Sequence, residues 1–314
     1  MKNVNGLCCT EKSGIISKNN GFGLDAVEIL KQNLEQNKTL SEEQHSHILG
    51  LFRRYLLVGG MPDAVNTYLD THNIVKVREI QQSIMTLYTD DAAKYENDNN
   101  KNLLIRRIYE MVPSQMENKK KRIVAKDIRD KKGDRFSYYM DEFEYLISSG
   151  ITIGVHAITN PIFPLRESVT KNLLKLYLND VGILTAQLYR NNISPVLDDE
   201  KSINLGAVYE SVVAQELRTH GHKLFYYDNR KKGEVDFLID NYSRTSITPI
   251  EVKSGKDYTV HNALNSLLNT IDYHIDTAIV LSNEREIRQI GAVTYLPIYH
   301  IMRLHASESD DVIF

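Results

Sequence analysis

The sequence has no tryptophan and only two cysteines, Cys8 and Cys9, which are adjacent. Two neighbouring cysteines exclude a disulfide framework and a four-ligand zinc site, and they fit a reducing cytoplasm. Long apolar runs are missing too, since no stretch approaches the roughly 20 residues that a helix needs to cross a bilayer. The first residues lack the basic and then apolar order of a signal peptide. We therefore expect a cytoplasmic protein with no membrane partner.

An excess of positive charge is also missing. The 314 residues carry 38 Lys and Arg against 41 Asp and Glu, which gives a formal net charge of −3. This balance excludes binding of nucleic acid through the whole surface, so any such contact must come from a local patch. Hydrophobic residues make up 42% of the chain, which is enough for about two domains with cores of their own.

The first third of the chain has a helical pattern. Residues 1–23 hold few apolar side chains, and we expect a loose N-terminus there. In residues 24–98, apolar side chains recur at spacings of three and four, which is typical of packed helices. The stretch "VGGMPDAV" (58–65) interrupts this pattern with a sharp turn, and Pro62 suits the first turn of the next helix. The pattern predicts a helical region with one break.

Residues 99–195 have the order of a winged helix-turn-helix. Three helical stretches come first: "NLLIRRIYEMV", "IVAKDI" and "RFSYYMDEFEYLISSG". A hairpin follows, in which we expect the strands "ITIGVHAI" and "IFPL" around the turn at Asn160-Pro161. In winged helices the third helix usually enters the major groove of DNA.

Residues 196–314 alternate between predicted strands and helices. A helix ("GAVYESVVAQELRTHG") precedes three strands ("KLFYYD", "EVDFLID" and "ITPIEVK"), and a helix near 263–270 precedes the strand "TAIVLS". This alternation favours a mixed sheet with helices on its faces. The whole chain therefore predicts an α+β multidomain protein: a helical region, a winged helix and a C-terminal α/β domain.

Three charged residues lie inside predicted strands of the last region: Asp236, Glu251 and Lys253. Strand pairing would bring the two carboxylates together, and without a cation they repel, so either one takes up a proton or a metal ion binds. One residue separates Glu251 from Lys253, so both side chains lie on one strand face. Carboxylates suit Mg²⁺ or Mn²⁺, and a lysine can orient the attacking water or stabilise the negative transition state. The pattern predicts a metal-dependent phosphodiesterase centre, although an E-x-K alone more often marks a solvated strand face or an ion pair.

Five stretches together resemble one known family. They are "RRYLLVGGMPDAV" (53–65), "LLKLYLNDVGILTAQL" (173–188), "GAVYESVVAQEL" (206–217), "GEVDFLID" (233–240) and "TPIEVKSG" (248–255). Their order and spacing resemble the C-terminal part of bacterial and archaeal AAA-type ATPases. In that family a helical lid and a winged helix precede a restriction-endonuclease-like PD-(D/E)xK domain of poorly defined function.

The resemblance implies roles for regions and residues. Residues 24–98 correspond to the lid, 99–195 to the winged helix and 196–314 to the nuclease-like domain. By the same resemblance Glu210 completes the metal site with Asp236 and Glu251 or binds a second metal ion, and Gln215 supports it. Glu234 is near enough in sequence either to contribute or to be an ordinary charge at the strand edge.

The family carries an ATPase core upstream of the lid, and this sequence lacks its signature. It has no G-x-x-x-x-G-K-[ST] loop, because Gly255-Lys256 has neither the upstream glycine nor the following hydroxyl. We expect no ATP site, and a truncated or split member of the family that works with a separate ATPase or another protein partner.

Positive charge gathers in the basic segment, residues 119–135, which holds nine Lys and Arg against three Asp. It covers the second predicted helix and the entry to the third, where a winged helix meets phosphates. The predicted nucleic-acid contacts are Lys119, Lys120, Lys121, Arg122, Lys126 and Arg129. The alternative is a solvated, lysine-rich loop. Three acids on the expected exposed side of the third helix, Asp141, Glu142 and Glu144, argue against base recognition.

Two functions follow from these patterns. The first is Mg²⁺- or Mn²⁺-dependent cleavage or processing of DNA by Asp236, Glu251, Lys253 and Glu210. The second is a module without catalysis that keeps the nuclease fold and binds DNA or a protein. Both need the same fold, so the pattern leaves both open.

Overall fold

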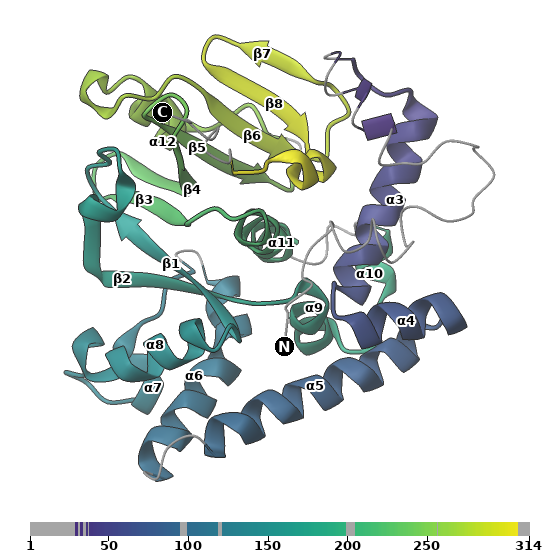
Figure 1. Ribbon diagram of the computed structural model, residues 1–314, viewed down its shortest axis with the longest axis vertical. Helices are drawn as coiled ribbons and strands as arrows, with labels where there is room; N and C mark the ends of the chain where they lie inside the picture. Colours follow the sequence, from purple (N-terminus) through teal and green to yellow (C-terminus); the bar gives the residue numbers. More distant parts are fainter. Residues whose placement is uncertain are drawn as a thin grey trace, which may run out of the picture.

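A computed structural model describes residues 29–306 apart from 31, 34–35, 37, 95–98, 119–120, 199–204 and 256. The predicted loose N-terminus and two predicted nucleic-acid contacts, Lys119 and Lys120, lie outside the described residues. Within the described ranges, a helical N-terminal part precedes a mixed sheet (Figure 1). The expected α+β class is confirmed at this level.

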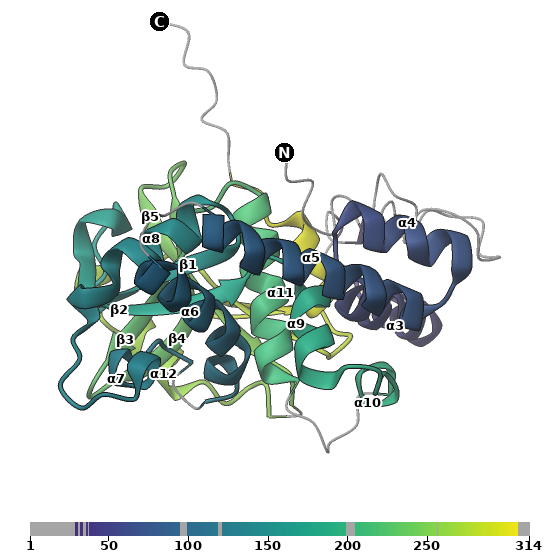
Figure 2. The ribbon, with the colours of Figure 1, turned by 90° about the horizontal axis from the view of Figure 1, so that it is seen from below.

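The N-terminal part includes α3 (Glu42–Val58), α4 (Pro62–Thr71) and α5 (Ile74–Lys94). The hydroxyl of Ser41 accepts from the Gln44 N–H, and the Gln44 side chain accepts from the Ser41 N–H, so a capping box begins α3. Gly59, at φ 74°, ends α3, and Pro62 begins α4 as predicted. Figure 2 shows α3 and α4 beside one half of the long α5.

The middle of the chain holds three helical segments and a hairpin. They are α6 (Asn99–Glu117), α7 (Ala125–Arg129), η1 (Phe136–Tyr139) with α8 (Met140–Ser148), β1 (Thr152–Ile158), η2 (Leu165–Ser168) and β2 (Val169–Leu178). The prediction of "IFPL" as the second strand was wrong. Pro161 and Pro164 lack the N–H groups that a sheet needs, and the chain reaches the sheet only at Val169.

The last part alternates helices and strands as predicted. Its elements are α9 (Val181–Tyr189), α10 (Ser194–Leu197), α11 (Gly206–Thr219), β3 (Phe225–Asn229), β4 (Gly233–Asn241), β5 (Ser246–Lys253), α12 (Asn262–Leu268), η3 (Ile271–Tyr273), β6 (Ala278–Ser282), β7 (Arg288–Ile290), β8 (Val293–Pro297) and η4 (Ile298–Arg303).

All described strands belong to one sheet, in the order β2-β1-β3-β4-β5-β6-β8-β7. β1 pairs antiparallel with β2 and parallel with β3, which joins the hairpin to the C-terminal strands. The hairpin therefore does not stand apart as an exposed wing. The predicted boundary between residues 195 and 196 separates two segments that contribute to the same sheet.

Helix α11 lies at the centre of the molecule, between the sheet and α9 (Figure 1). Every side chain from Ala207 to Leu217 is buried. The opposite face of the sheet is covered by α12, whose Leu264 and Leu267 join a second apolar cluster with Tyr227. Because α11 is enclosed on all sides, any charged residue on it must find a partner inside the protein.

Buried polar side chains tie α11 to the N-terminal helices. The Tyr55 hydroxyl donates to Glu216 Oε1 over 2.9 Å and accepts from Gln215 Nε2 over 2.7 Å. The Val181 N–H donates to Gln215 Oε1 over 2.8 Å. Gln215 thus joins α3, α9 and α11, and does not support the acidic residues as the resemblance implied.

Candidate functional site

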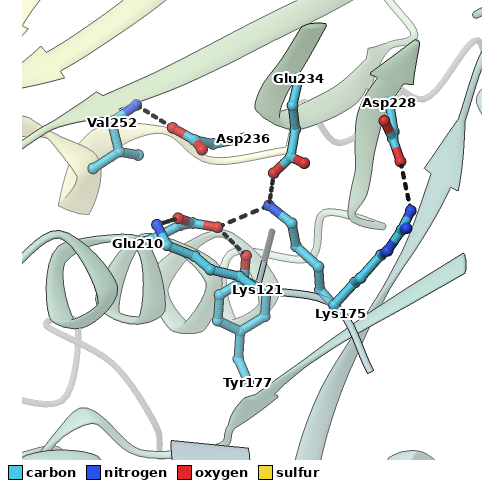
Figure 3. Close-up of polar contacts among 9 residues, drawn as sticks. Lys121, Lys175, Tyr177, Glu210, Asp228, Glu234, Asp236 and Val252 are labelled. Carbon is cyan, nitrogen blue, oxygen red and sulfur yellow. Dashed lines mark hydrogen bonds and ion pairs between the residues drawn. The ribbon is translucent and has the colours of Figure 1, made fainter. Parts of the chain in front are cut away.

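The four residues predicted to form the site come from three neighbouring elements. Asp236 lies on β4, Glu251 and Lys253 on β5, and Glu210 on α11. Lys253 Nζ lies 2.8 Å from Glu251 Oε1, so these two side chains share a strand face as expected. The Val252 N–H donates to Asp236 Oδ2 over 2.8 Å, which holds Asp236 against β5 (Figure 3).

A bulge in β4 sets the position of Asp236. Between the pairs Phe225–Leu238 and Tyr227–Val235, β3 has one residue and β4 has two, Asp236 and Phe237. Such a bulge bends the strand locally and redirects side chains, and bulges are common beside active sites. The backbone pairing of β4 with β5 ends at Phe237–Ile250. Beyond this last pair, the Asp236 carboxylate accepts a hydrogen bond from the Val252 N–H of β5.

Glu210 is held by three side chains that the sequence pattern did not assign to it. Its carboxylate forms ion pairs with Lys121 and with Lys175 Nζ, the latter over 3.0 Å, and accepts from the Tyr177 hydroxyl (Figure 3). Lys175 and Tyr177 stand on β2, in register with Val155 and Ile153 of β1. The hairpin therefore supplies two of the side chains that contact Glu210.

Glu234 also belongs to this group. Lys175 Nζ lies 2.7 Å from Glu234 Oε1, and its ammonium sits 4.7 Å from the centre of the Tyr226 ring. The site charges are the carboxylates of Glu210, Glu234, Asp236 and Glu251 and the ammonium groups of Lys121, Lys175 and Lys253. Four acids face three ammonium groups, so the group is close to neutral.

The acids of the group have opposite pKa shifts. Burial would raise the pKa of Glu210, but Lys175 and Lys121 outweigh it and lower this pKa to about 2. Burial, together with Glu210 and Glu251, raises the pKa of Asp236 to about 7. Burial also raises the pKa of Glu251 against the opposing effect of Lys253. The three predicted carboxylates thus differ: the pKa of Glu210 is lowered, and those of Asp236 and Glu251 are raised.

Lys175 and Tyr177 were missed because their strand was misplaced. A signal was present, since both alternate with Leu174, Leu176 and Leu178 in "LLKLYL", as expected for a strand with one polar face. The Lys175 side chain is 0% exposed, which is rare for a lysine without a partner. A lysine inside a buried strand implies buried acids opposite it.

The basic segment divides into two parts. Lys121 and Arg122 are engaged in ion pairs, with Glu210 and with Asp228 at 3.3 Å. Lys126 and Arg129 are exposed, as are Lys131, Lys132 and Arg135. Of the predicted nucleic-acid contacts, the described residues therefore place Lys121 in the acidic group and leave Lys126 and Arg129 at the surface.

The acids of α8 are not all exposed. Asp141 and Glu144 are exposed as expected, but Glu142 is buried. Asp141 pairs with Lys101 of α6 over 3.0 Å. The prediction that Glu142 faces solvent was wrong, because it lies next to Phe143 on the side of the helix that packs inward.

The described residues contain no group of three or more His, Cys, Asp or Glu placed to hold a metal ion. The carboxylate oxygens of Glu210 are occupied by ammonium and hydroxyl groups. Glu251 Oε2 is buried with no hydrogen-bond partner among the described residues, so Glu251 has an oxygen that a hard divalent cation shared with Asp236 could use. Two carboxylates are enough for Mg²⁺, which keeps several water ligands.

Two stretches of the chain match known domains. Residues 49–194 match a domain of unknown function (DUF8612), and residues 205–301 match a second domain of unknown function (DUF4143), known from AAA-ATPase-associated proteins. No curated protein and no solved structure matches the chain. None of the helices in the described ranges is long and apolar enough to cross a bilayer.

Proposed function

We propose that this chain is a metal-dependent DNA nuclease or DNA-processing module of an AAA-ATPase-associated system. The observation that carries the proposal is the meeting of Asp236, Glu251 and Lys253 where β4 and β5 separate, with one carboxylate pKa raised to about 7. Raised carboxylate pKa values beside a lysine are typical of sites that bind metal or transfer protons.

The fold that we propose for this centre is of the PD-(D/E)xK type, preceded by a winged helix. Support comes from the order of α6, α7, α8 and the β1–β2 hairpin, and from the acidic residues on β4, β5 and α11. The match of residues 205–301 to a domain known from AAA-ATPase-associated proteins agrees with a partner ATPase.

In the proposed reaction Asp236 and Glu251 would hold Mg²⁺ or Mn²⁺ near the start of β4 and the end of β5. The ion would neutralise charge on the scissile phosphate and lower the pKa of a bound water. As a ligand Asp236 would be deprotonated, so metal binding would release the proton that it keeps up to about pH 7. Lys253, with 27% of its side chain exposed, reaches solvent and stabilises negative charge on the phosphate oxygens.

Incubation of plasmid and single-stranded DNA with Mn²⁺ tests this function. Wild type should cleave, and Asp236→Ala should lose at least about a hundredfold in rate, as expected when an essential catalytic group is removed. Asp70→Ala removes an exposed carboxylate of α4 and should cleave like wild type. Equal cleavage by Asp236→Ala and wild type, or no cleavage by wild type, would contradict nuclease activity.

The second function, a binding module without catalysis, is favoured by one specific observation: Glu210 is already neutralised by Lys121 and Lys175. DNA would then be held by the exposed part of the basic segment. Neutralising Lys126, Arg129, Lys131 and Lys132 should reduce the slope of log affinity against log salt by up to ~0.9 for each phosphate that the protein no longer neutralises. An unchanged slope would assign these residues to solubility.

A further inference from the structure

The two lysines that hold Glu210 differ in burial and in their number of partners. The Lys175 side chain is 0% exposed and joins two carboxylates, Glu210 and Glu234. The Lys121 side chain is 20% exposed, and the described residues give it one carboxylate partner, Glu210. Removing Lys175 would leave Glu234 without its cation and Glu210 with Lys121 alone, whereas removing Lys121 would leave Glu210 still paired with Lys175.

The two lysines also differ in their backbone setting. Lys175 stands in the middle of β2, whose strand pairing with β1 fixes its position. Lys121 stands between the end of α6 at Glu117 and the start of α7 at Ala125, at φ 46°. A left-handed backbone conformation is unfavourable for a lysine and is kept only where surrounding contacts impose it. The ion pair with Glu210 is such a contact.

The charges of the site change in a definite way when Lys121 leaves. When all four acids are ionised, as a metal ligand at Asp236 requires, they face three ammonium groups with Lys121 in place, and one negative charge is left. Without Lys121 two negative charges are left, which one divalent cation would neutralise. At the same time Glu210 Oε2 is freed beside Asp236, whose pKa is raised by the Glu210 charge.

We propose that Lys121 is an internal counter-cation that occupies Glu210 in place of a divalent ion. While the ion pair stands, Mg²⁺ or Mn²⁺ has only Asp236 and Glu251 as ligands. When Lys121 leaves, Glu210 becomes the third carboxylate ligand and the affinity for the metal rises. This inference rests on the proposed function, because it takes the metal centre at Asp236 and Glu251 as its starting point.

Calorimetric titration of Mn²⁺ into the full chain, first freed of metal with EDTA, tests the competition without any cleavage assay. Lys121→Met keeps the length of the side chain and removes its charge. It should tighten Mn²⁺ binding at least about tenfold, since a hydrogen bond to a charged group is worth about that factor. Lys121→Gln, which keeps a donor without the charge, should give a smaller gain and serves if Lys121→Met folds poorly in a thermal melt.

Two further variants test whether a gain in Mn²⁺ affinity comes from the freed Glu210 or from the loss of a positive charge in general. Glu210→Gln in the Lys121→Met background should return the affinity to the wild-type level, because the third ligand is removed. Lys76→Met removes one exposed charge from α5 and should leave the affinity unchanged.

The outcomes distinguish this inference from the proposed function. If wild type binds Mn²⁺ and Glu251→Gln does not, the metal centre stands; equal affinity of Lys121→Met and wild type then overturns the inference alone. A gain that persists after Glu210→Gln overturns it as well. If neither wild type nor Lys121→Met binds Mn²⁺, the metal centre and the inference both fail.

Discussion

At the scale of single residues, partners decide the behaviour of chemically identical groups. Glu210 is almost fully buried, yet its pKa is lowered to about 2, because Lys175 and Lys121 overcome the cost of burial. Among the described residues, no ammonium group forms an ion pair with Asp236, which keeps its proton to about pH 7. The two carboxylates therefore differ in charge at mildly acidic pH, although they influence each other directly.

The pH dependence of Asp236 can be measured in the stability of the protein. Its pKa is 3.8 before folding and about 7 after it, so between these values the native state holds more protons than the unfolded state. The free energy of unfolding therefore falls as pH rises through this window. An amide at this position would not titrate. From pH 5 to pH 8 the free energy of unfolding of wild type should fall relative to that of Asp236→Asn. The relative change should be on the order of 2 kcal/mol, reduced by partial solvent screening.

Urea titrations in EDTA at several pH values measure this difference. Glu210 titrates below this window, since its pKa is lowered, and does not disturb the comparison. Asp70→Asn, at an exposed position, should follow wild type at every pH. A constant difference between Asp236→Asn and wild type across the range would show that Asp236 is ionised throughout.

At the scale of elements, the junction of α3, α4 and α9 explains two of the stretches that carry the family resemblance. Asp180 caps α9 by accepting from the Ile183 N–H over 3.0 Å, and its other oxygen accepts from the Gly60 N–H over 2.7 Å. Arg78 of α5 donates to the carbonyl oxygens of Leu57 and Gly182. Hydrogen bonds thus hold the turn in "VGGMPDAV" (58–65) against "NDVG" (179–182), which belongs to the stretch 173–188.

Gly59 makes this junction sensitive to a single methyl group. It has φ 74° and ψ −166°, a conformation open in practice to glycine alone, and a Cβ there would overlap the Asp180 carboxylate. Gly59→Ala should cost about 3 kcal/mol of unfolding free energy, from backbone strain and the displaced carboxylate together. Urea denaturation of the full chain measures it.

Gly291→Ala is the matched control. Gly291 also has a positive φ, 59°, but a Cβ there meets nothing within 4 Å, so its variant carries backbone strain alone, about 1 kcal/mol. Equal costs for the two variants would mean that Asp180 moves aside freely and that the junction is not rigid.

At the scale of the whole molecule, the sheet unites segments that the hydrophobic pattern separates. β3 has β1 as one neighbour, and Glu210 of α11 has Lys175 of β2 as a partner. Residues 196–314 alone would expose the edge of β3 and leave Glu210 and Glu234 without Lys175. Burying unpaired charges is costly, so the segment depends on the residues before it.

Expression of residues 196–314 as a separate chain tests this dependence. We expect no cooperative unfolding transition in urea followed by circular dichroism, and binding of a hydrophobic dye to the exposed faces. Co-expression with residues 1–195 should restore a cooperative transition through association of the two chains. A cooperative transition of the isolated segment near that of the whole chain would show that it folds independently.

Local sequence pattern by itself determined where most helices and strands lie. It also determined that acids stand on β4 and β5 and that Glu251 and Lys253 share one strand face. These depend on periodicity and on neighbours a few residues away, which a sequence displays directly. Only the tertiary structure decided that Lys175, Tyr177 and Lys121 surround Glu210, because these contacts join residues 33 to 89 positions apart. It also decided, through the bulge in β4 and the pairing of β1 with β3, where Asp236 lies and that the hairpin belongs to the central sheet. Such long-range pairings depend on which buried charges can neutralise each other, and no local spacing records that choice.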